Sequence, residues 1–570
     1  MTSRNISTSP FNSHPAKTDW RGLFRLYAFF FYFSGVTHVI LQLMGATVFV
    51  GLRQAIVMSL LWLIPVLLFP QRTKAISALI GAVLWLFSLV NLGYFCIYQQ
   101  EFSQSVIFII FESNPAESAE FVSQYFVWWM IPVLLLHTTV AIWLWHRLRP
   151  VILTSKKVTV ISLAILSLLF FYPLFKQLVL KQSPLPVALE KIQNNMEPAV
   201  PWQLVMGYVN YKTQLNNMEK LLEQNSKIPP LKNLQDVNAD VPATLVLVIG
   251  ESTNRQHLSL YGYHRKTTPL LDAMRDQLTI FNHVVTSRPS TIEALQQVLT
   301  FADQDHPDRY LTEPSLMNLM KQAGYKTFWI TNQQTVTKRN TMLTTFAKHT
   351  DKQIFLNNTR SQNSEQYDEN VLPPFAEVLK DKAPRKFIVV HLLGTHLKYQ
   401  YRYPAAYDYF NTREGLPSAL TEAKAEVVNT YDNAVLYNDF VVSSLIEQLK
   451  TAVPNGLLLY LSDHGEDVYD SPPYNMLGRN EYSPTLPMYA IPFFLWESPA
   501  RKSTHPRNWS TMLNRTYSTA DFIYTWSDLA GLRYDGFDAR KSLVSDEYQA
   551  MPLKIGNPYD KKSLTVLAPE

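Results

Sequence analysis

Two acidic segments of the sequence each follow an unbroken apolar run. Glu251 comes directly after Leu245–Ile249 and Gly250, and Asp463–His464 lies near the end of Gly456–Glu466, GLLLYLSDHGE. Together they offer oxygen and nitrogen ligands without sulfur, the set that suits Zn²⁺ in a catalytic site with an open position. A solvated turn glutamate and a hydrogen-bonded Asp–His pair are the alternatives. Either segment alone is weak support, whereas the two together predict a metal site.

A hydroxyl group lies between these segments. Thr291, within the stretch TSRPSTIEALQQVL (residues 286–299), begins an amphipathic helical pattern. Threonine is a favoured helix N-cap, so one interpretation of Thr291 is purely structural. A hydroxyl at a helix N-terminus is also well placed as a nucleophile, because the helix dipole stabilises negative charge and a neighbouring Zn²⁺ lowers the hydroxyl pKa. The residues alone leave both interpretations open.

For the acidic segments to form one site, the strands that carry them must end at the same edge of a sheet. From Thr244 onward, apolar runs typical of buried strands alternate with helical stretches, which predicts an α/β domain with a mainly parallel central sheet. Ligands bind outside the carboxyl ends of such strands. The strand candidates are Leu245–Ile249, Tyr325–Thr331, Phe387–His391 and Gly456–Ser462, and the helix candidates are residues 291–301, 314–323, 371–379 and 431–451.

The first third of the chain has a different composition. Five apolar segments precede residue 181, and crossing a bilayer takes about 20 residues. Lys and Arg concentrate in alternate loops, while the loop at residues 99–125 has glutamates and no Lys or Arg. This predicts five membrane-spanning helices with everything after Lys176 outside the cytoplasm, rather than a bundle of buried soluble helices. The segments are Phe24–Ala46, Leu52–Phe69, Ala75–Tyr98, Phe126–Trp145 and Val158–Lys176.

The predicted organisation has three parts. A transmembrane domain covers residues 1–180, a linker covers 181–242, and an outer domain covers 243–570. Within the linker, Leu204–Glu223 has helical spacing that suits either the membrane surface or packing on the outer domain. The formal net charge of +5 is too small to favour nucleic acid as a partner. The single cysteine, Cys96, excludes an intrachain disulfide and a cysteine metal site.

The motifs taken in order carry a resemblance. The series LVLVIGES, SRPST, AGYKTFWITNQ, VVHLLGTH, YDN and SDHGE resembles the membrane-anchored phosphoethanolamine transferases of Gram-negative bacteria, in the alkaline phosphatase/sulfatase superfamily. The resemblance covers the whole chain and looks closest to the CptA-type branch, which modifies the lipopolysaccharide core. It implies a multi-pass inner-membrane protein with a periplasmic sulfatase-like domain. It further implies transfer of phosphoethanolamine from phosphatidylethanolamine to a heptose of the inner core, through a covalent phospho-threonine.

The resemblance also implies roles for individual residues. Glu251, Asp463 and His464 match zinc ligands, and Thr291 matches a residue that is both ligand and nucleophile. His396 matches a histidine that faces the ethanolamine phosphate or a second zinc. His391, inside a predicted strand, is expected to be a structural histidine with satisfied hydrogen bonds.

One feature departs from the family pattern. Relatives often carry a further histidine about a dozen residues after the Asp–His pair, but here the stretch Asp470–Asn475 has none and the next is His505. Tyr474 in that stretch suits a hydrogen bond to a phosphate oxygen and is a poor zinc ligand. The sequence therefore predicts one tight zinc rather than two.

Three other functions compete with this interpretation. A glycerol phosphotransferase of the same superfamily, acting on an envelope glycan, would share Thr291 and the zinc site and differ in the donor headgroup. A sulfatase requires a Cys or Ser in a C/S-x-P-x-R setting, which residues 287–291 do not match. A membrane scaffold without turnover predicts that Thr291 is dispensable.

Overall fold

The computed structural model covers most of both predicted domains. It describes residues 19–43, 49–98, 128–180 (apart from 152 and 154–155), 199–209 and isolated residues between 181 and 227, then residues 228–567 apart from 335–340, 358–365, 482 and 560–563. The chain divides into two compact units. One comprises residues 1–107 and 121–210, and the other comprises residues 108–120 and 211–570.

The first unit is helical. Its main elements are α1 (Trp20–Leu43), α2 (Phe49–Ser59), α3 (Leu63–Leu68), α4 (Thr73–Tyr98), α7 (Met130–His146) and α8 (Lys156–Phe175). In the described residues, three stretches are long and apolar enough to cross a membrane, namely Trp20–Ile40, Pro70–Gly93 and Lys157–Leu180. Leu52–Leu68 and Met130–His146 are apolar but shorter. The described residues of the five predicted segments therefore lie mainly on helices, and the count of five spans stays a prediction.

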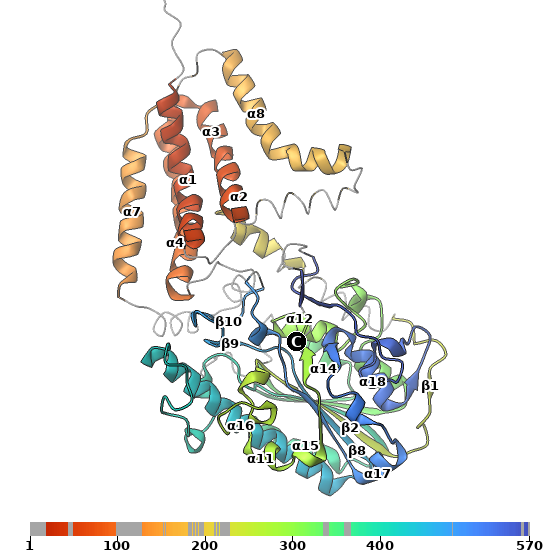
Figure 1. The fold of residues 1–570 in the computed structure, drawn as a ribbon. Helices are drawn as coiled ribbons and strands as arrows, with labels where there is room; N and C mark the ends of the chain where they lie inside the picture. The colour runs from red at the N-terminus through yellow and green to blue at the C-terminus, as the bar shows by residue number, and fades with distance from the viewer. Residues whose placement is uncertain are drawn as a thin grey trace, which may run out of the picture. The chain divides into compact units, whose positions relative to one another are not determined.

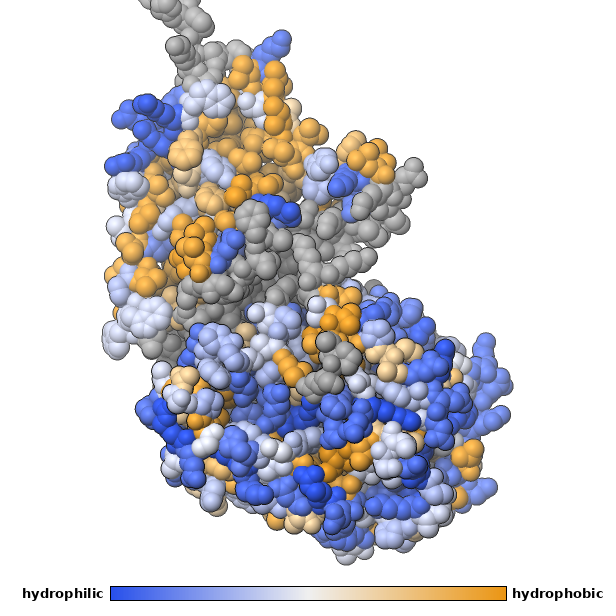
Figure 2. All heavy atoms as spheres, viewed as in Figure 1, coloured by the Kyte–Doolittle hydropathy of each residue, from blue (hydrophilic) through white to orange (hydrophobic). Residues whose placement is uncertain are grey.

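The outward-facing side chains of this unit are largely apolar. Leu79 is 72% exposed and Leu136 is 65% exposed. Figure 2 shows an extensive hydrophobic surface over the helical unit, whereas the surface of the second unit is mostly hydrophilic. Apolar surface on this scale is costly in water and suits lipid. Residues 202–209 are helical and include the start of the helix predicted at Leu204–Glu223. Most of the rest of that predicted helix lies outside the described residues.

The second unit is built on a seven-stranded sheet in the order β3-β11-β8-β2-β7-β5-β6. Neighbouring strands are parallel from β8 to β6, whereas β11 pairs antiparallel with both β8 and β3. The sheet is therefore mixed, with the predicted parallel arrangement in five strands. The strands are β2 (Ala243–Gly250), β3 (Leu278–Ile280), β5 (Lys326–Gln334), β6 (Lys352–Asn357), β7 (Arg385–His391), β8 (Gly456–Ser462) and β11 (Phe493–Glu497).

Helices cover both faces of this sheet (Figure 1), which explains why the central strands are apolar without alternation. On one face, Leu245, Leu247 and Ile249 of β2 belong to the core that includes α12, α13 and α18. On the other face, Val246 and Val248 pack in the core with α15 and α16. These helices are α12 (Thr291–Val298), α13 (Leu316–Gln322), α15 (Leu372–Leu379), α16 (Glu422–Ala452) and α18 (Phe522–Ala530).

The pairing of β2 with β8 positions the site. The two strands are parallel neighbours in the middle of the sheet, and Gly250 lies opposite Ser462 at their carboxyl ends. The next residue of each strand is an acid, Glu251 on one and Asp463 on the other. The two acidic segments noted in the sequence thus meet at one edge of the sheet.

Candidate active site

The turn after β2 is held from several sides. Ser252 has a φ of 58°, an uncommon conformation for a residue other than glycine and one that is often found at functional sites. Its carbonyl accepts a hydrogen bond of 2.7 Å from the Tyr431 hydroxyl, and its backbone N–H donates to Asp463 Oδ1 at 3.1 Å. The Ser252 hydroxyl donates to Glu251 Oε1 at 3.0 Å. These contacts aim Glu251 at the end of β8.

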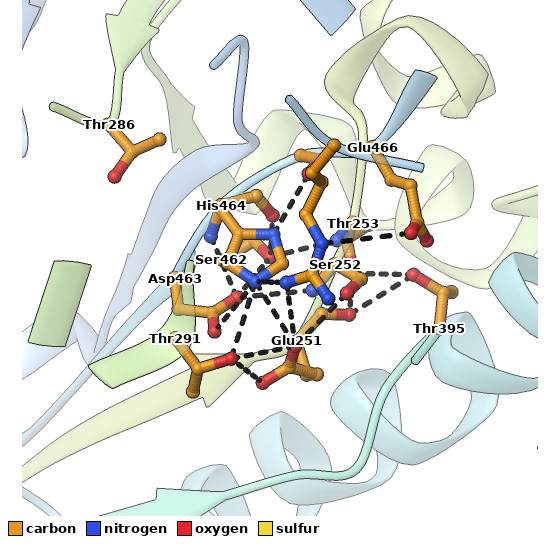
Figure 3. Close-up of polar contacts among 12 residues, drawn as sticks. Glu251, Ser252, Thr253, Thr286, Thr291, Thr395, Ser462, Asp463, His464 and Glu466 are labelled. Carbon is orange, nitrogen blue, oxygen red and sulfur yellow. Dashed lines mark hydrogen bonds and ion pairs between the residues drawn. The ribbon is translucent and has the colours of Figure 1, made fainter. Parts of the chain in front are cut away.

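Glu251, Asp463 and His464 form a buried cluster. One ligand atom of each lies within 4.8 Å of the others, and His464 Nε2 is 3.2 Å from Glu251 Oε1 and 3.4 Å from Asp463 Oδ2. His464 Nδ1 is 2.8 Å from the Gly465 carbonyl oxygen, which can only accept a hydrogen bond. The proton therefore lies on Nδ1, and the unprotonated Nε2 lies beside the carboxylates (Figure 3).

Thr291 belongs to this cluster. Its hydroxyl donates to Glu251, with Oγ1 at 3.1 and 3.0 Å from the two carboxylate oxygens, and Oγ1 is 3.3 Å from His464 Nε2. The helix N-cap is Ser290, with a φ of −147°, and Thr291 is the first residue of α12. The interpretation of Thr291 as an N-cap is therefore wrong, because its hydroxyl contacts the acidic cluster and the preceding serine holds the cap position.

The electrostatics of the cluster call for a cation. Glu251 and Asp463 are fully buried, and Asp463 Oδ2 has no hydrogen-bond donor among the described residues. Burial and the neighbouring Glu251 carboxylate raise the pKa of Asp463 well above its ordinary value. Burial and the charge of Arg479 lower the pKa of His464, which keeps the imidazole neutral. Two buried carboxylates and a neutral imidazole fit Zn²⁺, whose charge would compensate both acids.

His396 and His391, the two other histidines considered in the sequence, differ in their surroundings. His396 is half-buried, its Nδ1 atom is buried without a hydrogen-bond partner among the described residues, and desolvation lowers its pKa to about 3 despite the Glu251 charge. His391, at the end of β7, was expected to be satisfied. That expectation is wrong, because neither ring nitrogen has a hydrogen-bond partner in the described part of the chain and the ring packs edge-on against Trp329. Burial lowers the pKa of His391 to about 4.

Tyr474 is not brought into the cluster. Its described hydrogen bonds are to Ser471 and, through its carbonyl, to Lys424. Its predicted contact with phosphate stays a prediction. Arg479, by contrast, lies at the site with Nη1 2.5 Å from His464 Nε2. The sequence predicts no role for Arg479, because nothing in its spacing indicates that a hairpin returns it to the strand ends.

Comparisons with known proteins agree with this geometry. Residues 243–532 match the Sulfatase family. The chain is 52% identical over 549 residues to phosphoethanolamine transferase CptA of Salmonella typhimurium (strain LT2), covering 96% of this chain and 95% of the relative. The chain belongs to the phosphoethanolamine transferase family. The resemblance to the CptA-type branch is thereby confirmed, and the protein is a transferase.

Two solved structures extend the match. The transferase is similar to the C-terminal periplasmic domain of EptC from Escherichia coli in complex with zinc, with a TM-score of 0.58 and 58% identity over 60% of this chain and 96% of that one. The integral membrane protein lipooligosaccharide phosphoethanolamine transferase A (EptA) from Neisseria meningitidis shares the fold, with a TM-score of 0.61 and 20% identity over 92% of this chain and 97% of that one. The transferase is thus a membrane protein with a soluble, sulfatase-like C-terminal domain. Because that EptC domain was solved with zinc, the cluster of Glu251, Asp463 and His464 is the candidate zinc site of this chain.

Proposed function

We propose that the transferase moves phosphoethanolamine from phosphatidylethanolamine to a heptose of the lipopolysaccharide inner core. The relative at 52% identity supports phosphoethanolamine as the transferred group, and the apolar helices, which suit a membrane protein, support a lipid as the donor. We further propose five spans in the inner membrane within residues 1–180, a linker at 181–242 and a periplasmic catalytic domain at 243–570.

One observation carries the assignment of the nucleophile. The Thr291 hydroxyl donates to Glu251 and lies 3.3 Å from His464 Nε2, rather than capping the helix that it begins. In the proposed first half-reaction, Thr291 Oγ1 forms a bond to the donor phosphorus and the bond from phosphorus to the glycerol oxygen breaks. Diacylglycerol leaves and stays in the bilayer. The proton lost by Thr291 balances the proton gained by the diacylglycerol oxygen.

The second half-reaction restores the enzyme. The acceptor hydroxyl on the core forms a bond to phosphorus, the bond from phosphorus to Thr291 Oγ1 breaks, and the acceptor proton is balanced by reprotonation of Thr291. Glu251 orients the threonine hydroxyl for the first half-reaction through the hydrogen bonds already described, and accepts from that hydroxyl again when the second half-reaction has released it. His396, half-buried and neutral, is proposed to face the phosphoethanolamine group.

The cluster also defines the role of the cofactor. Glu251, Asp463 and His464, with Thr291 beside them, would hold one zinc ion. Bound zinc supplies positive charge that lowers the pKa of an adjacent hydroxyl and stabilises negative charge on phosphoryl oxygens. The fold buries the three ligand side chains, and the Gly465 carbonyl fixes the tautomer of His464.

Turnover of a fluorescent phosphatidylethanolamine by the purified full chain tests the nucleophile. Thr291→Ala should lower the rate of fluorescent diacylglycerol release by roughly 10³-fold or more, because the attacking atom is lost. Ser290→Ala is the matched control, since it removes the neighbouring hydroxyl, which makes no capping hydrogen bond. Intact-protein mass spectrometry without acceptor should find phosphoethanolamine on wild type and not on Thr291→Ala. Turnover by Thr291→Ala at nearly the wild-type rate would rule out Thr291 as the nucleophile.

The donor is tested in the same assay. Fluorescent phosphatidylglycerol offered in place of phosphatidylethanolamine should be turned over far more slowly. Preferential use of phosphatidylglycerol would instead favour the alternative of a glycerol phosphotransferase. Mass spectrometry of core oligosaccharide from cells with and without the protein identifies the acceptor sugar.

A further inference from the structure

A short hairpin after the Asp–His pair brings a cation to the zinc cluster. Strands β9 (Asp467–Val468) and β10 (Leu477–Gly478) pair antiparallel, with Gly478 opposite Asp467. Gly478 has a φ of +90°, a conformation that favours glycine. The next residue is Arg479, whose guanidinium thereby lies beside the residues at the end of β8.

The Arg479 guanidinium contacts the cluster at several points. Its Nη1 lies 2.5 Å from His464 Nε2 and 4.0 Å from Glu251 Oε1, and its Nε lies 3.8 Å from Glu466 Oε1. The side chain is 20% exposed, whereas the three cluster residues are fully buried. Arg479 is therefore accessible to a ligand arriving from solvent, as is the half-buried Thr291.

A buried ion pair fixes this segment relative to the nucleophile. Arg288 Nε is 2.5 Å from Glu481 Oε1 and Arg288 Nη2 is 3.2 Å from Glu481 Oε2, a bidentate pair with both side chains largely buried. Arg288 lies three residues before Thr291, and Glu481 lies two residues after Arg479. The pair thus ties the loop that carries the nucleophile to the segment that carries the guanidinium.

Zinc and Arg479 cannot both use His464 Nε2. That nitrogen has one lone pair, which accepts from Arg479 in the present geometry, and zinc requires the same lone pair. With zinc bound, the guanidinium must turn away from His464 while its backbone stays tied through Glu481. Its N–H donors would then be free to bind another acceptor. A guanidinium presents a rigid fork of donors that matches two phosphate oxygens.

We propose that Arg479 is the phosphate-binding cation of this active site, and that it holds two oxygens of the donor phosphodiester beside Thr291. This inference rests on the proposed function, because it assigns the donor phosphate to the site of Thr291.

Binding of a soluble donor headgroup tests the proposal without turnover. The probe is sn-glycero-3-phosphoethanolamine, titrated calorimetrically into the zinc-loaded full chain in detergent, in the Thr291→Ala background. Arg479→Gln should weaken binding about 10- to 100-fold, the loss expected for charge-assisted hydrogen bonds. Arg479→Lys should give an intermediate affinity, because it keeps the charge and loses the fork. Arg540→Gln, which removes an exposed arginine paired with Asp538, should bind like the parent.

Two further measurements separate this inference from the proposed function. Zinc content should remain one per chain in Arg479→Gln. When Thr291 is intact, Arg479→Gln should raise the KM for phosphatidylethanolamine by about the same factor as it weakens headgroup binding. Unchanged headgroup affinity and KM would overturn the role of Arg479 even if Thr291 is the nucleophile. Loss of zinc from Arg479→Gln would also overturn it, because Arg479 would then support the metal site. Failure of wild type to turn over the donor would refute the proposed function instead.

Discussion

Gly394 packs directly against the backbone of Glu251. A Cβ added to Gly394 would lie 2.7 Å from both the backbone nitrogen and the carbonyl oxygen of Glu251, and Gly394 has a φ of +56°. The neighbouring Thr395 N–H donates to the same Glu251 carbonyl at 3.0 Å. The segment after β7 therefore acts as a support for the metal cluster.

Gly394→Ala should weaken zinc binding about 10- to 100-fold, the usual effect of disturbing residues that orient metal ligands. The methyl group would push Glu251 out of line with Asp463 and His464. Zinc affinity measured by competition with a chelator checks this. Gly536→Ala is the control, since Gly536 has a φ of +88° with no described atom within 4 Å of its added Cβ. It should cost about 1–2 kcal/mol of stability and leave zinc affinity unchanged.

Metal content tests the cluster itself. We expect about one zinc per purified chain after dialysis, and loss of that zinc in Glu251→Ala and in Asp463→Ala, because each change removes one of three ligands. Glu369→Ala, which removes an exposed carboxylate, should keep the zinc. Saturating zinc at about 100 times its Kd should stabilise the folded protein by about 2.7 kcal/mol. Two zinc ions per chain would contradict the prediction of a single tight site.

A buried histidine predicts a pH dependence of stability. His257 Nδ1 is 2.6 Å from Asp432 Oδ1, and His257 Nε2 is 2.8 Å from Asp470 Oδ1. Although burial lowers it, the Asp470 and Asp432 carboxylates together raise the pKa of His257 to about 10. A raised folded-state pKa means that the stabilisation is fully present below the ordinary value of 6.5 and is lost as the pH rises toward 10.

His257→Gln should therefore lower the free energy of unfolding by about 3–5 kcal/mol near pH 6.5, the cost of removing one partner from a buried ion pair. The difference from wild type should shrink steadily between pH 6.5 and pH 10. Thermal unfolding of the full chain at fixed zinc concentration measures it. His306→Gln, which replaces an exposed histidine, is the control. A difference that does not change with pH would show that His257 is neutral in the folded protein.

The alternation of basic loops predicts the topology. Arg72–Lys74 and Arg147–Lys157 should lie in the cytoplasm, and the chain after residue 180 should lie outside it. Alkaline phosphatase fused after Glu570 should be active, because that reporter folds only outside the cytoplasm, and a fluorescent protein fused there should be dark. The opposite pair of results would reverse the orientation.

Much of the site was predictable because its signals are local. The strands β2 and β8 are largely apolar and are each followed by an acid, and their predicted bounds agree with the structure to within two residues. The antiparallel strands β3 and β11 were not predicted. β3 has three residues, and a short apolar run such as β11 does not show by periodicity alone whether it is a strand.

The tertiary structure decided which of these local features meet. Glu251 and Asp463 are 212 positions apart in the sequence, and only the pairing of Gly250 with Ser462 makes them neighbours. The same holds for Arg479, which a hairpin returns to His464, and for Thr291, whose hydroxyl points to Glu251 instead of its own helix. Apolar runs and helical spacing set the elements because they depend on neighbouring residues along the chain. Contacts between side chains at strand ends depend on sheet order and register, which arise only when the whole domain packs.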